Sequence, residues 1–295
     1  MEIIKIFKEF DTEAKCYQHL EKIKWNNQPI CPYCQSSKAS KRKNEFRYKC
    51  LKCNCSFSVL VGTVMEGTKL PILKWFMAIG LILNAKKGIS SLQLSRDLGI
   101  NKNTAWYLQK RIRSAMSEDD NLLKGVIEAD ESYIGGSLDN KHKKLKKERQ
   151  FYRSGMEHKT PILGMMERKG KVIVKVLDKA WGKEIKPLMK QFIDVKSEIV
   201  TDGFGGYKDL DQYFSKHVVL NHTQYIRRVE DYHTNTIEGF WSMFKRSIVG
   251  QYHQITKKYL QEYINEMVFK FNYRNDNRRF NILINKCLKS TNAFY

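Results

Sequence analysis

The spacing of hydrophobic and polar residues changes near residue 125. Upstream, apolar residues recur every three or four positions, which predicts a helix over 11–25 and helical structure over 71–116. Downstream, short apolar runs alternate with turns that contain glycine, a pattern typical of strands. These runs predict a strand that starts at Val126, a hairpin over 160–178 with its turn at 168–170, and two more strands that start near 197 and 217.

Helical patterns separate and follow these strands. One covers 181–195 despite Pro187, one covers 233–246, and the last covers 256–275, where Leu260, Ile264, Met267 and Phe271 share a face. The order of strand, hairpin, helix, two strands and helix predicts a mixed sheet flanked by helices. We therefore expect an α+β chain with three domains, which comprise residues 1–62, 63–122 and 123–295.

Basic residues outnumber acidic residues by 53 to 31, which gives a formal net charge of +22. Such an excess favours a polyanionic partner, and nucleic acid is the first expectation. An anionic membrane is the alternative, but no apolar run approaches the ~20 residues that span a bilayer, so no membrane partner is expected. The start of the chain, MEIIKIFKEF, carries acids within its apolar stretch, which is atypical of a signal peptide. We expect a cytoplasmic, nucleoid-associated protein.

The basic charge is densest at 140–153, where seven Lys or Arg residues accompany one acid. We place this segment in an insertion near 137–158, within the third domain. A solvated loop explains such a run, and a basic flap that contacts nucleic acid is the alternative.

Four of the seven cysteines form two CxxC pairs: Cys31 with Cys34, and Cys50 with Cys53. Each pair supplies two thiolates from one tight turn, and four thiolates at tetrahedral angles are typical of a structural Zn²⁺ site. A redox pair is the alternative, although two spaced pairs favour a metal. The chain therefore predicts a zinc ribbon. The remaining cysteines are interpreted as packing residues: Cys16, Cys55 and Cys287.

Residues 88–116 have the layout of a helix–turn–helix. Ser90 or Ser91 caps a first helix, Gly99 ends it, and a second helix begins near Asn101. Many helical hairpins share this layout, so by itself it does not establish DNA binding. The neighbouring zinc ribbon and the basic net charge make a DNA-binding role more strongly supported. Residues expected to face bases are Asn101, Lys102, Asn103 and Thr104, and those expected to reach phosphates are Lys110, Arg111 and Arg113. Expected core residues are Leu92, Leu98, Ile100, Ala105 and Leu108.

Three carboxylates occur where two strands and a helix can bring them together. Asp130 lies in the first predicted strand, Asp202 ends a later strand, and Glu238 lies in the helical segment 233–246. At one edge of a sheet they could hold two divalent ions ~4 Å apart, which would bridge the attacking and leaving oxygens of a phosphodiester. Oxygen ligands suit Mg²⁺.

Each carboxylate also has a purely structural explanation. Asp130 could be a surface acid, Asp202 could form an Asx turn, and Glu238 could complete a capping box with Asn235. The joint pattern favours the metal site, because Lys245 lies two helical turns beyond Glu238 and can meet a phosphate.

Four further residues surround this pattern in the sequence. Alternation along the first strand places Glu128 on the face of Asp130, as a neighbour of the metals, and Glu131 on the other face. Phe240 and Trp241 are expected to pack the helix against the core.

The order of zinc ribbon, helix–turn–helix and Asp…Asp…Glu resembles the DDE transposases of insertion sequences in the group related to Merlin elements, the ISXO2-like family. The resemblance covers nearly the whole chain and rests on the segments CPYC…CLKC, ADESYIGG, TDGFGGY and HTNTIEGFWSMFKR. Asp202 and Glu238 have thirty-five residues between them, a spacing that many DDE enzymes show.

The resemblance implies an RNase H-like catalytic domain, in agreement with the predicted order of elements. It implies that Asp130, Asp202 and Glu238 hold two Mg²⁺ (or Mn²⁺) ions and that Lys245 contacts the DNA end. Some relatives have Asn at the third position, so Asn235 is the alternative to Glu238; we prefer the carboxylate because it binds Mg²⁺ better than a neutral amide does. His233 is interpreted as a scaffold residue or a contact to the scissile phosphate.

The expected function is that of a transposase, which binds terminal inverted repeats, cuts the strand and joins the freed 3′-hydroxyl to target DNA. Its expected partner is double-stranded DNA, both element ends and target, and the resemblance implies a homodimer or a larger synaptic complex. Two alternatives stay open: an RNase H-like nuclease without strand transfer, and a DNA-binding regulator without catalytic activity.

Overall fold

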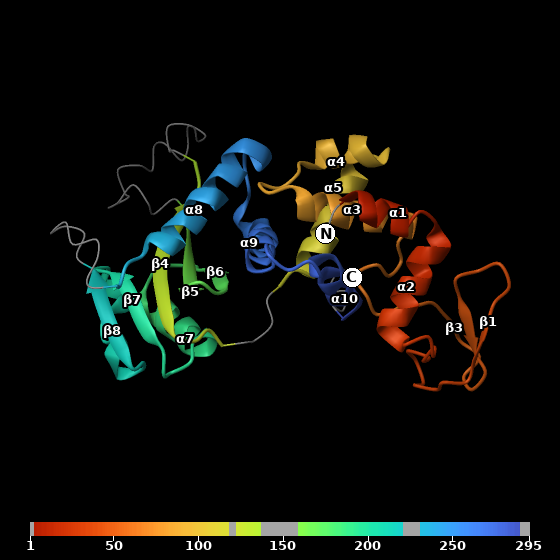
Figure 1. Cartoon of the computed structure of the whole chain (residues 1–295), viewed down its shortest axis with the longest axis horizontal. Helices are drawn as coiled ribbons and strands as arrows, with labels where there is room; N and C mark the ends of the chain where they lie inside the picture. Colours follow the sequence, from red (N-terminus) through yellow and green to blue (C-terminus); the bar gives the residue numbers. More distant parts are fainter. Residues whose placement is uncertain (1–2, 118–121, 137–158, 221–230, 290–295) are drawn as a thin grey trace. The chain divides into compact units, whose positions relative to one another are not determined.

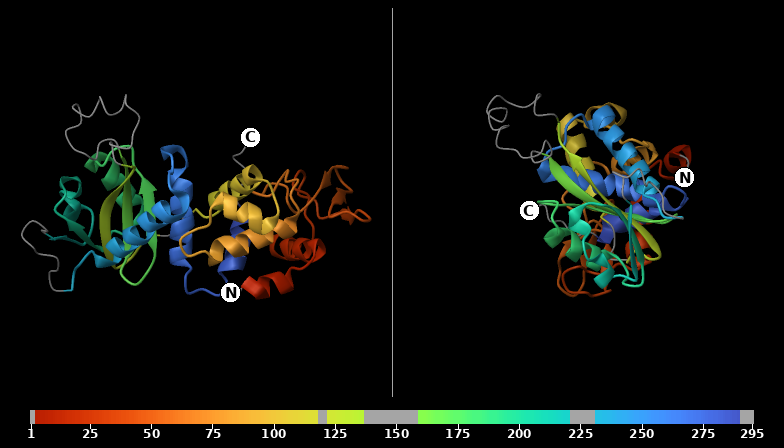
Figure 2. Two further views of the ribbon diagram at one scale, coloured as in Figure 1. Left: turned by 90° about the horizontal axis from the view of Figure 1, so that it is seen from above. Right: turned by 90° about the vertical axis from the view of Figure 1, so that its left-hand side faces the viewer.

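The computed structural model describes residues 3–117, 122–136, 159–220 and 231–289. Its contacts divide the chain into two units, one formed by Met1–Ser117 together with Tyr273–Tyr295, and the other by Glu118–Asn272. Figures 1 and 2 show the elements of both units, coloured along the sequence. The basic insertion predicted near 137–158 lies outside the described residues.

The first unit combines a small antiparallel sheet with helices. The sheet has the strand order β1-β2-β3 and packs the rings of Tyr48 and Phe57 against Trp25, with ring centres 5.7–5.8 Å apart. The elements are α1 (Ile3–Glu9), α2 (Glu13–Trp25), β1 (Ala39–Lys41), β2 (Tyr48–Cys50), β3 (Ser56–Phe57), α3 (Ile72–Asn84), α4 (Ser91–Leu98), α5 (Lys102–Ser114) and α10 (Arg279–Lys289).

The ends of α4 and α5 lie where the polar residues predict them. Ser90 caps α4 by accepting a hydrogen bond from the backbone N–H of Gln93, and Gly99 ends the helix with a φ of 58°, in the left-handed region that glycine adopts at least cost. Asn101 then caps α5. Leu98, Ala105 and Leu108 are buried between the two helices as predicted, whereas the expectation for Leu92 was wrong, because it is 45% exposed.

The last described helix, α10, belongs to the first unit. Its Phe280 ring lies 5.7 Å from the ring of Phe10, just after α1, and 5.7 Å from the ring of Phe76 in α3. The sequence prediction assigned these residues to the third domain, because helical periodicity identifies an apolar face but not the surface that covers it. Cys16 and Cys287 are buried, as expected of packing residues, but Cys55 is exposed.

The second unit is built on a mixed sheet of five strands with the order β6-β5-β4-β7-β8. The central strand β4 pairs antiparallel with β5 and parallel with β7, while β6 and β8 form the edges. The strands are β4 (Val126–Ile134), β5 (Thr160–Glu167), β6 (Val172–Val176), β7 (Glu198–Asp202) and β8 (Lys216–Leu220). The predicted mixed sheet flanked by helices is therefore confirmed.

Helices cover both faces of this sheet, as can be followed in Figure 1. On one face, α7 packs Ile185 and Met189 against Ile127 and Ala129 of β4. On the other face, the aromatic side of α8 packs with α9 against β5 and β6. The helices are α7 (Gly182–Phe192), α8 (Asn235–Ser247) and α9 (Lys257–Asn272); 3-10 turns cover Gly205–Tyr207 and Leu210–Gln212, and a π-helix, Ile248–Tyr252, follows α8.

Alternation along β4 separates its acids between these two faces. Ile127 and Ala129 contribute to the core under α7, so Glu128 and Asp130 point to the side of α8, and Glu131 points back to the side of α7. Among the described helices, none combines the length and hydrophobicity that crossing a lipid bilayer requires.

Gly164 of β5 lies opposite Asp130 and leaves room for α8. A Cβ atom at this position would lie 2.5 Å from Cζ2 of Trp241 and 2.9 Å from Cδ1 of Ile237. We predict that Gly164→Ala lowers the free energy of unfolding by about 1–3 kcal/mol, because α8 must move to relieve the overlap. Urea denaturation of the full chain measures this change.

The matched control is Gly239→Ala in α8, where a Cβ atom meets nothing within 4 Å. This variant should gain ~0.5–1 kcal/mol from helix propensity. Equal stability of the two variants would contradict the packing of α8 on Gly164.

Candidate functional site

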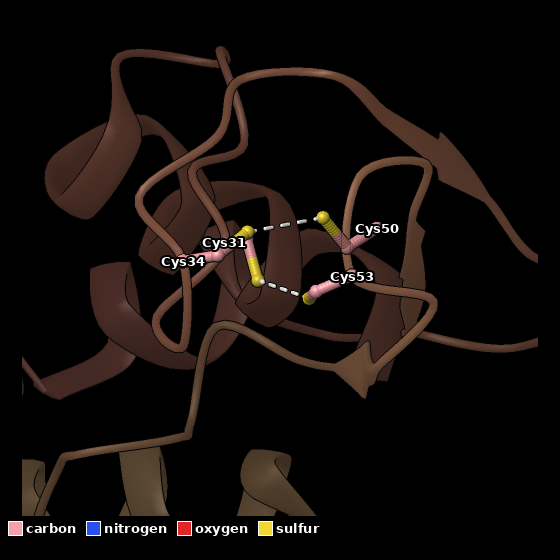
Figure 3. A group of neighbouring side chains, drawn as sticks. All are labelled: Cys31, Cys34, Cys50 and Cys53. Atoms are coloured by element: carbon pink, nitrogen blue, oxygen red, sulfur yellow. Dashed lines mark hydrogen bonds between the residues drawn. The ribbon is translucent and has the colours of Figure 1, made fainter.

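Four cysteines of the first unit gather their sulfur atoms around one point (Figure 3). The Sγ atoms of Cys31 and Cys53 lie 3.7 Å apart and those of Cys34 and Cys50 lie 3.5 Å apart. A tetrahedral ion with Zn–S bonds of ~2.3 Å would separate its sulfur ligands by ~3.8 Å. The spacing therefore fits the structural zinc predicted from the two CxxC pairs.

The backbone around Cys50 also stabilises a thiolate, the form that binds zinc. The backbone N–H of Cys53 is the main cause that lowers the pKa of Cys50 to about 6, and the N–H of Lys52, 3.4 Å from its Sγ, contributes as well. Among the described residues, these four cysteines form a group whose ligand atoms all lie within 4.8 Å of one another, close enough to bind one metal ion together.

The residues predicted to face DNA bases lie at the exposed start of α5. Asn101, Lys102, Asn103 and Thr104 all have exposed side chains. Asn101 has a structural role as well, since its Oδ1 accepts a hydrogen bond of 2.8 Å from the backbone N–H of Asn103.

The three basic residues predicted to reach phosphates differ in how far their side chains are buried. Arg113 is only 1% exposed, so the expectation that it contacts DNA was wrong. Arg111 donates to the carbonyl oxygen of Glu66 and lies 5.4 Å from the centre of the Trp75 ring, contacts that hold it against its own unit. Lys110 is half-buried. The prediction counted charge without asking which face of the helix each residue occupies.

Sequence reasoning missed an aromatic residue on the exposed side of α5. Tyr107 is 61% exposed and lies one turn after Asn103. Its ring meets that of Trp106 edge-on, with the centres 5.0 Å apart. Tyr107 could have been identified from its spacing, because it lies four residues after Asn103 and therefore on the same face of the helix.

The three predicted carboxylates lie on three elements of the second unit. β4 and β7 pair in register up to Glu128 and Val200, and extending that register by two residues brings Asp130 level with Asp202. Glu238 lies in the first turn of α8, on the face of the sheet that Asp130 faces. Asp130 and Asp202 are half-buried, and Glu238 is exposed.

Trp241 holds the Asp130 carboxylate. Its indole N–H donates a hydrogen bond of 2.9 Å to Oδ2 of Asp130. Phe240 and Trp241 are both buried, as predicted for packing residues, but Trp241 therefore has a second role that the sequence did not indicate. Because Gly164 has no side chain, the Trp241 ring can lie directly on β5 beside Asp130.

Negative charges at this edge of the sheet repel one another. Burial and then the charge of Asp202 raise the pKa of Asp130 to about 6, and Glu238 adds a smaller contribution. Among the described residues, no Lys or Arg forms an ion pair with any of these three carboxylates. Such unbalanced oxygen ligands fit a divalent cation such as Mg²⁺.

The carboxylates do not form one tight cluster. Their oxygen atoms do not gather in the way the cysteine sulfurs do, among the residues that the structure describes. A pair of ions ~4 Å apart does not require that all three ligands meet at one point.

Two of the structural explanations for these acids are tested by the hydrogen bonds. Asp202 does form the Asx turn, with its Oδ1 accepting from the backbone N–H of Phe204 at 3.0 Å. Asn235 is the first residue of α8 rather than its cap, so it forms no capping box with Glu238. Instead, Glu238 accepts a hydrogen bond of 2.9 Å from the hydroxyl of Thr234.

The remaining predicted residues of α8 lie at its two ends. Asn235 is exposed, one turn before Glu238, and Lys245 is exposed in the last turn of the helix. The helix therefore carries Asn235, Glu238 and Lys245 toward solvent while its aromatic side faces the core.

Glu128 joins β4 to the start of α8. Its side chain is fully buried, and its two oxygens accept hydrogen bonds from the backbone N–H groups of Thr236 and Ile237 at 2.9 and 3.1 Å and from the Thr236 hydroxyl at 2.8 Å. A negative charge at the N-terminus of a helix satisfies free N–H groups and complements the helix dipole. Glu128 is therefore an anchor of α8, not the neighbour of the metals that we expected.

Arg168 and His233 complete this anchor. Nε of Arg168 and Nδ1 of His233 lie 3.5 and 3.4 Å from the Glu128 carboxylate, and Arg168 donates to the carbonyl oxygens of Asp231 and His233. The structure places His233 as a scaffold residue, which was one of its two predicted roles.

Glu131 is a fourth acid near the same edge. It points to the α7 side of the sheet and accepts a hydrogen bond of 2.8 Å from the hydroxyl of Tyr207. Burial is the main cause that raises the pKa of Glu131 to about 7, and the charges of Asp202 and Asp130 raise it further. The concentration of negative charge therefore extends through the sheet.

Comparisons with known proteins match both the region of the four cysteines and the region of the five-stranded sheet. A family model described as an ISXO2-like transposase domain matches residues 122–272, and one described as a transposase zinc-ribbon domain matches residues 11–56. The chain is also 26% identical, over 252 residues, to an uncharacterized protein in transposable element ISH50 of Halobacterium salinarum. That alignment covers 81% of this chain and 84% of the relative.

We predict that Glu128→Gln lowers the free energy of unfolding by about 2–3 kcal/mol, because an amide removes the charge and offers one acceptor where two are needed. Urea denaturation measures the change. Asp211→Asn, at an exposed acid of the same unit, should change stability by less than ~0.5 kcal/mol. Similar losses in both variants would argue against the anchor.

We predict that Asp130→Asn stabilises the protein by ~1–3 kcal/mol at neutral pH without divalent cations, because it removes a repelled charge and keeps an acceptor for Trp241. The folded-state pKa is about 6, above the ordinary value of 3.8, so ionisation of Asp130 costs stability. The gain should be complete above that pKa and disappear as the pH falls toward the ordinary value. Unfolding of both proteins across this pH range checks the sign; a loss of stability at neutral pH contradicts it.

Proposed function

The chain belongs to the ISXO2-like transposase family, and we propose on that basis that it cuts the ends of an insertion sequence and joins them to target DNA. The observation that carries the proposal is that Asp130 and Asp202 belong to adjacent strands and, with Glu238 of α8, are close enough for the charges of Asp202 and Glu238 to act on Asp130. The transposable-element relative and the zinc-ribbon match support the same proposal.

The order of elements supports an RNase H-like catalytic domain. A central strand pairs antiparallel with its hairpin partner on one side and parallel with two later strands on the other, and helices cover both faces. Asp130 and Asp202 belong to the adjacent strands β4 and β7, and Glu238 belongs to the first turn of α8, which packs against β5 beside β4. In this proposal the unit Glu118–Asn272 contains the whole catalytic site.

Asp130, Asp202 and Glu238 would hold two Mg²⁺ or Mn²⁺ ions. When bound, such ions supply an activated nucleophile and stabilise charge on the leaving oxygen. Trp241 fixes the rotamer of Asp130 by holding Oδ2, and Glu128 fixes the start of α8 and with it the position of Glu238. Asn235 is the alternative third ligand, from the same exposed side of the helix.

The reaction would proceed in two displacements at phosphorus, a hydrolysis and then a transesterification. In the first, a water oxygen forms a bond to phosphorus at the element end and the P–O3′ bond breaks, which leaves a 3′-hydroxyl on the element. In the second, that hydroxyl oxygen attacks a target phosphate, and the target strand's own P–O3′ bond breaks. Neither step needs a covalent bond to the protein.

Recognition of the element ends is proposed for the first unit. Besides the zinc ribbon, this unit contains α4 and α5, a helix–turn–helix-like pair, and the exposed start of α5 carries Lys102, Asn103 and Thr104. Exposed polar residues at the start of a second helix are placed to contact base edges in a major groove. A dimer or larger assembly would bring two element ends together.

We predict that Asp130→Ala lowers both strand cleavage and joining by at least ~1,000-fold, which corresponds to ~4 kcal/mol of lost stabilisation of the transition state. The substrate is duplex DNA from the flanks of the coding sequence, with a pre-cut end for the joining step and a plasmid target. Glu238→Ala and Asn235→Ala, assayed together, identify the third ligand as the variant with the larger loss.

The Asp211→Ala variant serves as the control and should retain full activity. Cleavage without joining by the unaltered protein would favour the nuclease, and binding without either reaction would favour the regulator. Activity that survives Asp130→Ala would refute the catalytic assignment.

A further inference from the structure

The backbone pairing between β4 and β7 stops before it reaches the two aspartates of the proposed catalytic site. Among the described residues, the parallel pairing of these strands ends at Glu128 and Val200. Asp130 and Asp202 each lie two residues further along. Each strand continues to pair on its outer side, β4 with β5 as far as Ile134 and β7 with β8 as far as Asp202. At this edge the sheet therefore consists of two halves, and one aspartate belongs to each half.

A side-chain hydrogen bond joins the two halves beyond the end of this pairing. The hydroxyl of Tyr207 donates to Oε2 of Glu131 at 2.8 Å. Glu131 is the residue after Asp130 in β4, and Tyr207 lies in the turn five residues beyond Asp202, the last residue of β7. The hydrogen bond therefore connects the strand that carries one aspartate to the turn that follows the other.

Short-range hydrogen bonds fix Tyr207 relative to Asp202. Oδ1 of Asp202 accepts a hydrogen bond of 3.0 Å from the backbone N–H of Phe204. The carbonyl oxygen of Phe204 in turn accepts one of 3.1 Å from the backbone N–H of Tyr207. A continuous series of hydrogen bonds thus runs from the Asp202 carboxylate through the turn to Glu131, which is next to Asp130.

Close packing leaves the Tyr207 ring little freedom to move. The ring is only 1% exposed and belongs to the core under α7. A Cβ atom on Gly206 would lie 2.5 Å from the Phe204 ring and 3.0 Å from Cδ1 of Ile185 in α7, so the turn is tightly enclosed. Burial and then the charge of Glu131 raise the pKa of Tyr207 well above its ordinary value of 10. The hydroxyl therefore keeps its proton and acts as the donor.

The two aspartates repel each other across the gap between the halves. After burial, the charge of Asp202 is the largest cause that raises the pKa of Asp130. This repulsion favours a wider separation, which the hydrogen bond between Tyr207 and Glu131 opposes. Carboxylates that share one ion need a defined separation, because bonds to Mg²⁺ are only ~2.0–2.1 Å long and demand near-ideal geometry. A link that limits the separation keeps both aspartates within reach of one ion.

We propose that Tyr207 and Glu131 are positioning residues whose hydrogen bond sets the separation of Asp130 and Asp202, and with it the affinity of the site for a divalent cation. The inference rests on the proposed function, since it takes the two aspartates as ligands of a shared ion. It gives Glu131 a role on the α7 side of the sheet through its hydrogen bond, without contact to the ion.

The first test measures the binding of Mn²⁺ to the zinc-loaded full chain by isothermal titration calorimetry, without DNA. Tyr207→Phe removes only the hydroxyl and keeps the ring in the core, so the variant should fold normally. It should bind Mn²⁺ about tenfold more weakly, because partners beyond the ligands typically contribute 10–100-fold to metal affinity. An unchanged affinity for Mn²⁺ overturns the proposal.

The matched control is Tyr48→Phe. Tyr48 is also buried, and its hydroxyl donates a hydrogen bond of 2.9 Å to Glu21 in the other unit. This variant should lose stability in urea as Tyr207→Phe does, yet bind Mn²⁺ as the unaltered protein does. An equal loss of Mn²⁺ affinity in the two variants would mean that lost stability is the cause, and would contradict a positioning role.

The second test separates the hydrogen bond of Glu131 from its charge. Glu131→Gln keeps an acceptor for the Tyr207 hydroxyl and should retain the Mn²⁺ affinity within about threefold, whereas Glu131→Leu has no acceptor and should lose about tenfold. The double variant Tyr207→Phe, Glu131→Leu should lose no more than either single variant, because both remove the same bond. Equal losses in the Gln and Leu variants, or additive losses in the double variant, overturn the proposal.

The third test compares the need for the ion with the rate. Half-maximal cleavage by Tyr207→Phe should require about tenfold more Mg²⁺, and saturating Mg²⁺ should restore most of the rate, since both aspartates are still present. Asp130→Ala should not be restored in this way. A rate of Tyr207→Phe that stays low at saturating Mg²⁺ contradicts the proposal.

The two proposals fail in different ways. Mn²⁺ binding that Asp130→Ala leaves unchanged refutes the proposed catalytic site, and the positioning role with it. Mn²⁺ binding that Asp130→Ala abolishes but that the Tyr207 and Glu131 variants leave unchanged refutes the positioning role alone, and the catalytic site stands.

Discussion

The position of α8 depends on one buried carboxylate. Glu128 extends from the central strand to the N-terminus of α8 and accepts hydrogen bonds from two of its free backbone N–H groups. The helix begins without a side-chain cap of its own, so a residue more than a hundred positions earlier supplies the acceptor. This contact ties the first turn of α8, which contains the proposed ligand Glu238, to β4.

A second constraint is the concentration of negative charge in a strongly basic chain. The family assignment explains why such a chain should bind DNA, but burial and then the charge of Asp202 raise the pKa of Asp130, and burial and then the charges of Asp202 and Asp130 raise the pKa of Glu131. This arrangement costs stability in the absence of cations. In the proposed function, divalent ions between the acids and a phosphate would offset this cost, so the loss of stability and the proposed chemistry would have the same cause.

The hydrogen bonds distinguish the roles of the acids of β4 more clearly than their positions in the sequence do. Glu128 and Asp130 lie on the same face of β4, yet Glu128 accepts three hydrogen bonds from the start of α8, whereas Asp130 accepts one from the indole N–H of Trp241 in the next turn. Gly164 matters for the same reason, because the indole ring occupies the space where any side chain of β5 would lie. Local packing thus decides which carboxylate can hold a cation.

The sequence by itself determined the cysteine pairs, the helix that starts after Ser90 or Ser91 and ends at Gly99, and the strands of the sheet, and it singled out Asp130, Asp202 and Glu238 as candidates. These features depend on short-range rules: ligand spacing, turn and cap preferences, and periodicity. Only the tertiary structure decided that Arg113 is buried, that α10 packs with the first unit, that Glu128 anchors α8, and that Trp241 holds Asp130. Each of these depends on which surfaces meet across long stretches of chain, and a periodic pattern shows that a face will be covered without showing by what.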